Sequence, residues 1–163
     1  MKFLTNPLGL YIHIPFCEKK CNYCDFYSAF YNKDTLGVYL STLKGEIKKW
    51  GGTINRPIDT IYIGGGTPSL LGEEIISLLD CIKQSFTISD NAEITVEANP
   101  SSCNDFLKFA KQAGVNRLSI GVQTSSDETL KILGRTHTSR DAALTVTKAR
   151  ELGFDNLSLD LMI

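Results

Sequence analysis

The sequence predicts an α/β fold built on a parallel sheet, and two observations support this class. Five short apolar segments alternate with helical segments along the 163 residues. Parallel strands need crossover connections, and helices usually supply them with a right-handed path. Hydrophobic residues make up 42% of the chain and charged residues 21%, which is typical of a globular domain with its own core. An open sheet and a partial barrel both satisfy this order of elements.

The first half of the chain is predicted to begin with a strand, a cysteine-rich loop and a helix. Strands are predicted at residues 10–14, 60–63 and 93–98, which are short and apolar. The first helix is predicted from Asp34, a residue type that favours the N-cap, to Trp50. Its apolar residues recur at helical spacing, and they are Leu36, Leu40, Leu43, Ile47 and Trp50.

The rest of the chain continues the alternation of strands and helices. Further helices are predicted at residues 73–86, 104–113, 130–133 and 139–152. Further strands are predicted at residues 117–122 and 157–162. Ser139 is expected to cap the last helix, and Gly114, Gly134 and Gly153 stand where helices commonly end. With no repeat or linker, residues 1–163 are expected to form one domain, cut short because its final apolar strand has no covering helix.

Composition and charge narrow the class of protein. The net charge is −1 with both signs scattered, so neither nucleic acid nor an anionic membrane is predicted as a partner. No apolar run approaches the ~20 residues of a membrane span, and the first ten residues lack the apolar core of a secretory signal. A cytoplasmic location is therefore expected, where thiols stay reduced. Cys81 and Cys103 stand alone and are predicted to be small buried side chains.

Three cysteines form a C-x₃-C-x₂-C cluster directly after the first predicted strand. Cys17, Cys21 and Cys24 are close enough in sequence for one loop to wrap three thiolates around a metal centre. A four-iron cluster usually takes four thiolates, so three would leave one iron open to another ligand. A zinc site that recruits His13, in a zinc-stabilised binding module, is one alternative. A thiol redox pair and unligated cysteines are the others.

Polar or glycine residues end the other four predicted strands. Residues 64–68, Gly-Gly-Gly-Thr-Pro, follow the second strand, and Glu97 closes the third. Gln123 follows the fourth strand, and Asp160 lies near the end of the fifth. Because parallel strands place their carboxyl ends together, where ligands bind, we expect these features to line one site. Taken one at a time, each feature has a simpler interpretation. The glycine run could be a turn, Glu97 could pair with a structural cation, and Gln123 and Asp160 could be turn or cap residues.

Three further polar residues have two interpretations each. Arg135 follows Gly134 and offers a fork of donors to a carboxylate, or is a solvated surface residue. His13 and His137 are the only histidines. Both are predicted to make structural hydrogen bonds rather than to ligate a metal.

With these residues noted, the sequence resembles a known family. The string C-x₃-C-x-Y-C, with Tyr23 before the last cysteine, is similar to the radical SAM signature. The surrounding strings resemble the oxygen-independent coproporphyrinogen III oxidase family. They are residues 11–17 (YIHIPFC), 63–69 (IGGGTPS), 97–100 (EANP), 117–123 (RLSIGVQ), 133–137 (LGRTH) and 160–162 (DLM). These motifs occur in order over nearly the whole chain.

The resemblance implies a partial (β/α)₆ barrel of the TIM type, truncated here after about five strands. Cys17, Cys21 and Cys24 would ligate a [4Fe–4S] cluster, and the amino and carboxylate groups of S-adenosylmethionine (SAM) would chelate its open iron. The positions that would contact SAM are Tyr11, Tyr23, Gly65, Gly66, Thr67, Glu97, Gln123, Arg135 and Asp160. The chemistry implied is one-electron reduction of SAM to methionine and a 5′-deoxyadenosyl radical, with a flavodoxin-like or ferredoxin-like protein as reductant.

One residue separates two branches of this family. The coproporphyrinogen dehydrogenases carry a further cysteine two residues after the third ligand, where this chain has Phe26. The Cys-Asp-Phe string is similar to the heme-chaperone branch, called HemW-like. The resemblance thus favours a heme chaperone in porphyrin and heme metabolism, with heme as a further ligand and a heme-acceptor protein as partner. The alternative is an enzyme that oxidatively decarboxylates coproporphyrinogen III to protoporphyrinogen IX.

Overall fold

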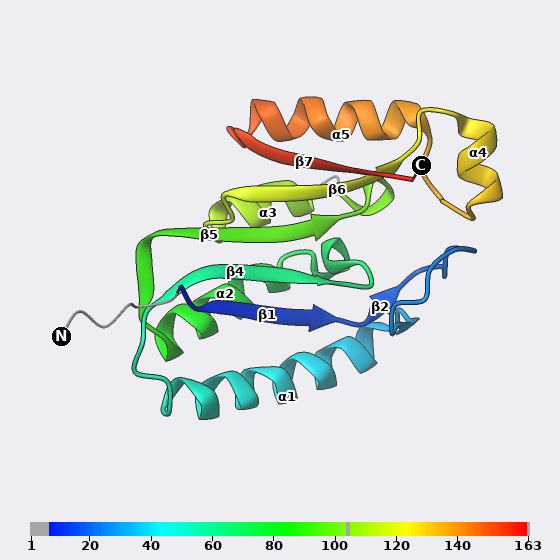
Figure 1. The fold of residues 1–163 in the computed structure, drawn as a ribbon. Coiled ribbons are helices and arrows are strands. Elements are labelled where there is room, and N and C mark those ends of the chain that lie inside the picture. The colour runs from blue at the N-terminus through cyan, green and yellow to red at the C-terminus, as the bar shows by residue number, and fades with distance from the viewer. Residues whose placement is uncertain (1–6, 104, 163) are drawn as a thin grey trace.

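A five-stranded parallel sheet forms the centre of the fold, as predicted. The computed structural model describes residues 7–103 and 105–162. The strands are β1 (Gly9–Ile14), β4 (Ile58–Gly65), β5 (Ile88–Ala98), β6 (Arg117–Gln123) and β7 (Asn156–Leu161). They lie in this order across the sheet, and each neighbouring pair is parallel. The carboxyl ends of all five strands therefore lie along one rim (Figure 1).

Helices connect the strands and cover one face of the sheet. They are α1 (Lys33–Gly51), α2 (Glu74–Ser85), α3 (Phe106–Gln112), α4 (Asp127–Ile132) and α5 (Ser139–Glu151). In Figure 1, α2 and α3 lie behind the sheet, while α1 runs below it and α5 above it. None of the described helices is long and apolar enough to span a membrane. The predicted start of the third helix at Asn104 lies outside the described residues.

Four short elements at the rim were not predicted. They are the paired strands β2 (Phe16–Cys17) and β3 (Ala29–Phe30), and the 3₁₀ turns η1 (Pro68–Leu71) and η2 (Pro100–Ser102). Each is too short to leave a periodic pattern in the sequence. Both 3₁₀ turns begin with a proline just after a strand carboxyl end. They hold the chain close to the rim before it enters the next helix.

The side chains of the sheet alternate between an apolar and a polar face. The apolar face is buried against the helices and contains Ile12, Ile14, Ile61, Ile63, Ile94, Val96, Leu118 and Ile120. On the other face, polar side chains bond across neighbouring strands. Ser119 Oγ donates to Asp160 Oδ1 at 2.9 Å, and Arg117 Nη1 donates to Thr95 Oγ1 at 3.3 Å. Parallel sheets are usually apolar on both faces, so this polar face indicates the interior of a partial barrel.

Both predicted helix caps were placed one or two residues too late. Asn32, not Asp34, caps α1, because its side chain accepts hydrogen bonds from two backbone N–H groups of the first turn. Thr138, not Ser139, caps α5, and it forms a capping box with Asp141. The cap residue needs an extended backbone with its oxygen reaching forward into the first turn. Asn32 and Thr138 both have that conformation.

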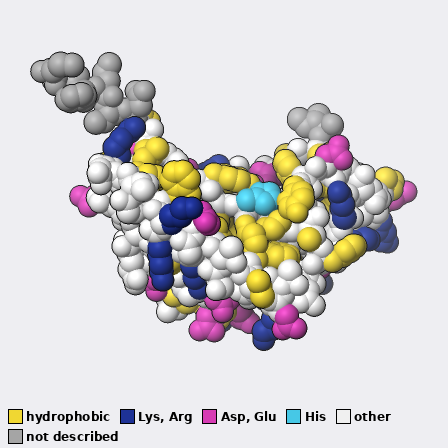
Figure 2. All heavy atoms as spheres, turned by 90° about the horizontal axis from the view of Figure 1, so that it is seen from below, with side chains coloured by type: hydrophobic (Ala, Val, Ile, Leu, Met, Phe, Trp, Pro, Cys, Tyr) yellow, Lys and Arg dark blue, Asp and Glu magenta, His cyan; other side chains and the backbone are white. Residues whose placement is uncertain are grey.

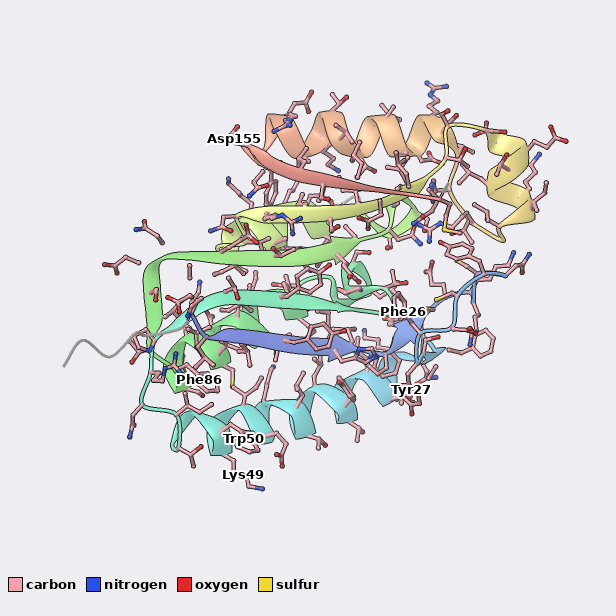
Figure 3. All side chains as sticks on the ribbon, in the orientation of Figure 1. Phe26, Tyr27, Lys49, Trp50, Phe86 and Asp155 are labelled. Carbon is pink, nitrogen blue, oxygen red and sulfur yellow. The ribbon has the colours of Figure 1, made fainter. Side chains whose placement is uncertain are left out.

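Trp50 has the helical spacing of the other apolar residues of α1, but it does not lie on the buried side of the helix. Its side chain is 57% exposed, whereas Leu36, Leu40 and Ile47 are buried. Figure 3 shows it beside Lys49 at the end of the helix. At the next residue, Gly51, α1 approaches α2 so closely that a Cβ would lie 2.3 Å from the Ser85 carbonyl oxygen. Figure 2 shows the molecule from below the view of Figure 1, where α1 and β1 lie, and apolar side chains are gathered on that side.

His137 joins the start of α5 to β6 and has the structural role expected for it. The side chain is only 3% exposed, and its Nε2 lies 3.2 Å from the Val122 carbonyl oxygen. Since a carbonyl only accepts, Nε2 must carry the hydrogen. The other ring nitrogen, Nδ1, is buried and has no hydrogen-bond partner among the described residues. Protonation of Nδ1 would therefore bury an unpartnered charged donor.

We predict that acidification destabilises the fold through His137. Burial, and secondarily the positive charge of Arg135, lowers the pKa of His137 in the folded protein. The unfolded chain, with a histidine pKa of about 6.5, then binds the proton more readily. This contribution to stability is present above about pH 6.5 and is lost as pH falls through the depressed folded pKa. Melting temperatures measured at about pH 7.5 and about pH 5.5 should differ less for His137→Gln than for the unmodified protein.

The matched control is His13→Gln, which changes the only other histidine. It should keep the full dependence of the melting temperature on pH. Equal dependence in the unmodified protein and in His137→Gln would contradict the prediction.

Candidate functional site

A cavity of about 410 Å³ opens at the rim formed by the strand carboxyl ends. Its size is within the range of small-molecule sites. Eleven of the twelve residues predicted for the site line it: Cys17, Cys21, Tyr23, Cys24, Gly65, Gly66, Thr67, Glu97, Gln123, Arg135 and Asp160. These residues come from segments as far apart as residue 17 and residue 160. Tyr11 is the one predicted residue that does not line the cavity.

The cysteine loop forms one side of the cavity. Cys17, Cys21 and Cys24 are partly buried, and none is in a disulfide. The sulfur of Cys17 accepts a hydrogen bond from Thr67 Oγ1 at 3.5 Å, and that of Cys21 accepts one from Arg135 Nη1 at 3.6 Å. Hydrogen bonds to sulfur are a usual feature of thiolates that ligate iron–sulfur clusters, where they tune the potential.

The glycine run packs against the start of the cysteine loop. The Gly66 N–H donates to the Ile14 carbonyl at 2.8 Å. A Cβ on Gly66 would lie 2.6 Å from the Phe16 carbonyl oxygen, so only glycine allows the two backbones to approach this closely. The run is therefore more than a turn, because it joins the end of β4 to the segment that begins the cysteine loop.

Both carboxylate oxygens of Glu97 accept hydrogen bonds. Tyr62 Oη donates to Oε1 at 2.8 Å, and the Gly65 N–H donates to Oε2 at 3.0 Å. Burial, followed by the hydrogen bond to Glu97, raises the pKa of Tyr62, so its hydroxyl remains a donor at neutral pH. Glu97 thus faces the cavity in a fixed orientation, on the polar face of the sheet.

Tyr11 reaches the site only through another aromatic ring. Its ring stacks on that of Tyr62, with centroids 6.1 Å apart and 25° between the planes. Its hydroxyl lies 2.9 Å from His13 Nδ1, so its hydrogen-bond partner is His13 rather than Glu97. The structure thus places Tyr11 behind Tyr62, in a position to support the ring that orients Glu97.

Gln123 and Asp160 lie on neighbouring strands at the other side of the cavity. Gln123 has φ = 68°, a strained conformation for a residue other than glycine. The register of β6 and β7 shifts at the same point, between Gly121 and Gln123. Such irregularities re-aim side chains and are common next to functional sites. Asp160, in turn, accepts a hydrogen bond from Ser119 on β6.

Arg135 is a cavity residue rather than a solvated surface arginine. Its Nη2 donates to the Gly121 carbonyl at 2.7 Å and to Asn99 Oδ1 at 3.1 Å, and its Nη1 donates to Cys21. Its Nε is buried and has no hydrogen-bond partner in the described chain. An unpaired buried donor is costly, so this N–H is available to an anionic group bound in the cavity.

Six polar residues that line the cavity were not predicted for the site: Lys19, Lys20 and Ser28 of the cysteine loop, and Tyr62, Asn99 and Ser119 at the strand ends. For the last three, a signal exists in the sequence. Tyr62 and Ser119 each stand two positions before a glycine at the end of an otherwise apolar strand, which places them on the polar face. Asn99 follows the third strand directly, two residues after Glu97.

His13, the fourth ligand of the zinc alternative, makes other contacts in this structure. Both ring nitrogens of His13 have other partners, the Tyr11 hydroxyl and the Tyr27 carbonyl. Within residues 7–103 and 105–162, no three His, Cys, Asp or Glu side chains are grouped to hold a single metal ion. Three thiols with donors to two of their sulfurs, beside an unpaired guanidinium N–H, instead fit a larger cluster with an anionic ligand next to it.

Comparison with known proteins places this arrangement in a family. A profile described as the Radical SAM superfamily matches residues 11–163. Heme chaperone HemW of Bacillus subtilis is 46% identical over 93% of this chain and 41% of its own length. Heme chaperone HemW of Escherichia coli is 43% identical over 96% of this chain and 42% of its own length. The chain therefore spans about two fifths of the length of these relatives.

A solved structure is also similar over nearly the whole chain. Coproporphyrinogen III oxidase (HemN) from Escherichia coli, described as a radical SAM enzyme, superposes with a TM-score of 0.88 and 32% identity. The match covers 95% of this chain and 37% of that protein. These comparisons confirm the predicted fold class and the resemblance inferred from the motifs.

We predict that the hydrogen bond between Tyr62 and Glu97 stabilises the folded protein. A hydrogen bond to a carboxylate contributes about 1.5 kcal/mol when it is partly buried. In a double-mutant cycle with Tyr62→Phe and Glu97→Gln, urea unfolding should show a coupling free energy of about 1.5 kcal/mol. The same cycle with Tyr11→Phe should be additive, because the Tyr11 hydroxyl bonds to His13. Additivity in the Tyr62 cycle would show that the bond is not formed.

Proposed function

Because the chain belongs to the radical SAM superfamily, we propose that Cys17, Cys21 and Cys24 hold a [4Fe–4S] cluster and that the adjoining cavity binds SAM. When bound, the cluster and SAM supply one-electron reductive chemistry. The observation that carries this proposal is the convergence of the cysteine loop and all four other strand ends on one cavity. Strands place these groups on a rigid frame, and the loop brings the thiols to it.

The cavity wall offers a suitable group for each charged part of SAM. The Glu97 carboxylate, oriented by Tyr62, would face the cationic groups of SAM. The unpaired Arg135 Nε would donate to the carboxylate of SAM. The remaining proposed contacts are Tyr23, Gly65, Gly66, Thr67, Gln123 and Asp160, which line the same cavity. Tyr11 would act indirectly, by packing on Tyr62.

We further propose that the protein works as a heme chaperone, with heme and a heme-acceptor protein as partners. Its support is the similarity to curated heme chaperones at 38–46% identity. Phe26 agrees with that branch, and its side chain is 67% exposed at the edge of the cavity (Figure 3). A flavodoxin-like or ferredoxin-like protein would supply the electron, in the cytoplasm.

Oxidative decarboxylation of coproporphyrinogen III is the second candidate function. The observation that favours it is the structural similarity to coproporphyrinogen III oxidase, at 32% identity. The same three-cysteine site and cavity would serve both functions. Ligand binding and turnover, rather than the cluster, must therefore distinguish them.

We predict that anaerobic reconstitution with iron and sulfide yields about four irons per chain. The EPR signal of the reduced cluster should change when SAM is added, because one iron is open to it. Cys21→Ala should abolish the cluster by removing one of three protein ligands. Cys81→Ala is the matched control, since that thiol is buried on α2 away from the cavity, and it should bind a normal cluster.

A full four-iron cluster in Cys21→Ala would contradict the ligand assignment. Zinc without iron in the unmodified protein would overturn the proposal as a whole.

We predict that the protein binds heme and does not consume coproporphyrinogen III. Heme titration followed by visible absorbance should saturate, whereas anaerobic assays with reductant and SAM should form no protoporphyrinogen IX. Phe26→Cys introduces the cysteine that the dehydrogenase branch carries at this position. This variant should still not consume coproporphyrinogen III, because we expect that more than one residue separates the branches. Turnover by the unmodified protein would favour the second candidate function instead.

A further inference from the structure

One asparagine of the cysteine loop, Asn22, forms hydrogen bonds to the end of α4. The loop follows β1 and β2, whereas α4 follows β6, which is three strands away from β1 in the sheet. The Asn22 N–H donates to the Leu133 carbonyl at 3.0 Å, and its Nδ2 donates to the Ile132 carbonyl at 2.7 Å. The last carbonyls of a helix have no partner within the helix, and Asn22 satisfies two of them at the end of α4. Figure 1 shows the loop after β2 reaching toward α4.

The end of α4 is shaped to receive this asparagine. Gly134 has φ = 76° and closes the helix. A Cβ on Gly134 would lie 3.1 Å from Asn22 Oδ1 and 3.3 Å from Asn22 N. The residue after this glycine is Arg135, whose guanidinium reaches back to the sulfur of Cys21. One turn of chain thus contacts the loop at two adjacent residues, Cys21 and Asn22.

These contacts bridge elements that the sheet keeps apart. The loop follows β1 and β2, and α4 follows β6, while β4 and β5 lie between β1 and β6 in the sheet. The contacts are therefore made across the carboxyl rim, above the cavity. They hold the middle cysteine against the rest of the cavity wall.

We propose that Asn22 is a positioning residue for the iron–sulfur cluster, acting together with Arg135 to fix Cys21. This inference rests on the proposed cluster at the three cysteines. We call the Asn22 bonds to Ile132 and Leu133, with the Arg135 bond to Cys21, the rim latch. Because the partner of the Asn22 side chain is the Ile132 carbonyl oxygen, the side chain at position 22 must be a donor. An aspartate has the same shape but would face a carbonyl with a carboxylate.

The test compares reconstituted clusters in the unmodified protein, Asn22→Asp and Asn22→Ala. Both variants keep the loop length and all three cysteines. Loss of the side-chain bond to Ile132 should loosen the rim latch and shift the EPR line positions and the midpoint potential of the cluster, because Cys21 is the residue next to Asn22. Bleaching of the cluster in air should be about fivefold faster, the change expected from losing one neutral hydrogen bond. Gly134→Ala should change the EPR signal, the potential and the lifetime in the same direction, because the added Cβ would push Asn22 away from the end of α4.

Asn116→Ala is the matched control for a general loss of stability. Asn116 also bridges two backbone groups, accepting from the Ile94 N–H and donating to the Ala92 carbonyl, each at 2.8 Å. It precedes β6 at the amino end of the sheet, away from the cavity. Its replacement should lower the melting temperature while leaving the EPR signal, the potential and the lifetime in air unchanged.

The outcomes separate this inference from the proposed function. A normal cluster in the unmodified protein, with the same EPR signal, potential and lifetime in Asn22→Asp, overturns the rim latch alone. A shift as large in Asn116→Ala as in the Asn22 variants also overturns it, since the effect would then be one of overall stability. No cluster in the unmodified protein overturns the proposed function and the latch together.

Discussion

The common direction of the five strands determines where everything else in this protein lies. Since all strands are parallel, each turn that follows a strand stands on the same rim, and the rim collects groups from residue 17 to residue 160. The period of two along each strand adds a second constraint. One face packs isoleucine, leucine and valine side chains under the helices, and the other is left with polar side chains that face the cavity.

The polar face of the sheet lowers the stability of the fold but supplies the groups that can bind a ligand in the cavity. Buried hydroxyl and carboxylate groups are unfavourable unless they are paired. Tyr62, Ser119 and Thr95 each have a partner on a neighbouring strand. These bonds keep the polar wall ordered before any ligand binds, so the orientation of Glu97 does not have to be organised at the moment of binding.

Two local irregularities occur at the same side of the rim. Gln123 has a left-handed backbone at a register shift, and the buried Nε–H of Arg135 has no partner in residues 7–103 and 105–162. Strain and unsatisfied donors are rare in folded proteins, and they collect at sites where a ligand will use them. The unpartnered Nδ1 of His137 is a different case, because that residue points into the packing between β6 and α5 rather than into the cavity.

The order of strands and helices, the cysteine cluster and the convergence of the strand ends could be predicted from the sequence. These depend on periodicity and on residue type, which are local properties of the chain. The caps predicted at Asp34 and Ser139 were wrong by one or two residues, because neighbouring residues with the same chemistry compete for the cap position. Which polar groups meet is a property of the folded chain: Tyr62 with Glu97, Arg135 with Cys21, and Asn22 with the end of α4. Such pairs join residues 35 to 114 positions apart, and no local pattern encodes them, because packing across the sheet and its rim selects the partner.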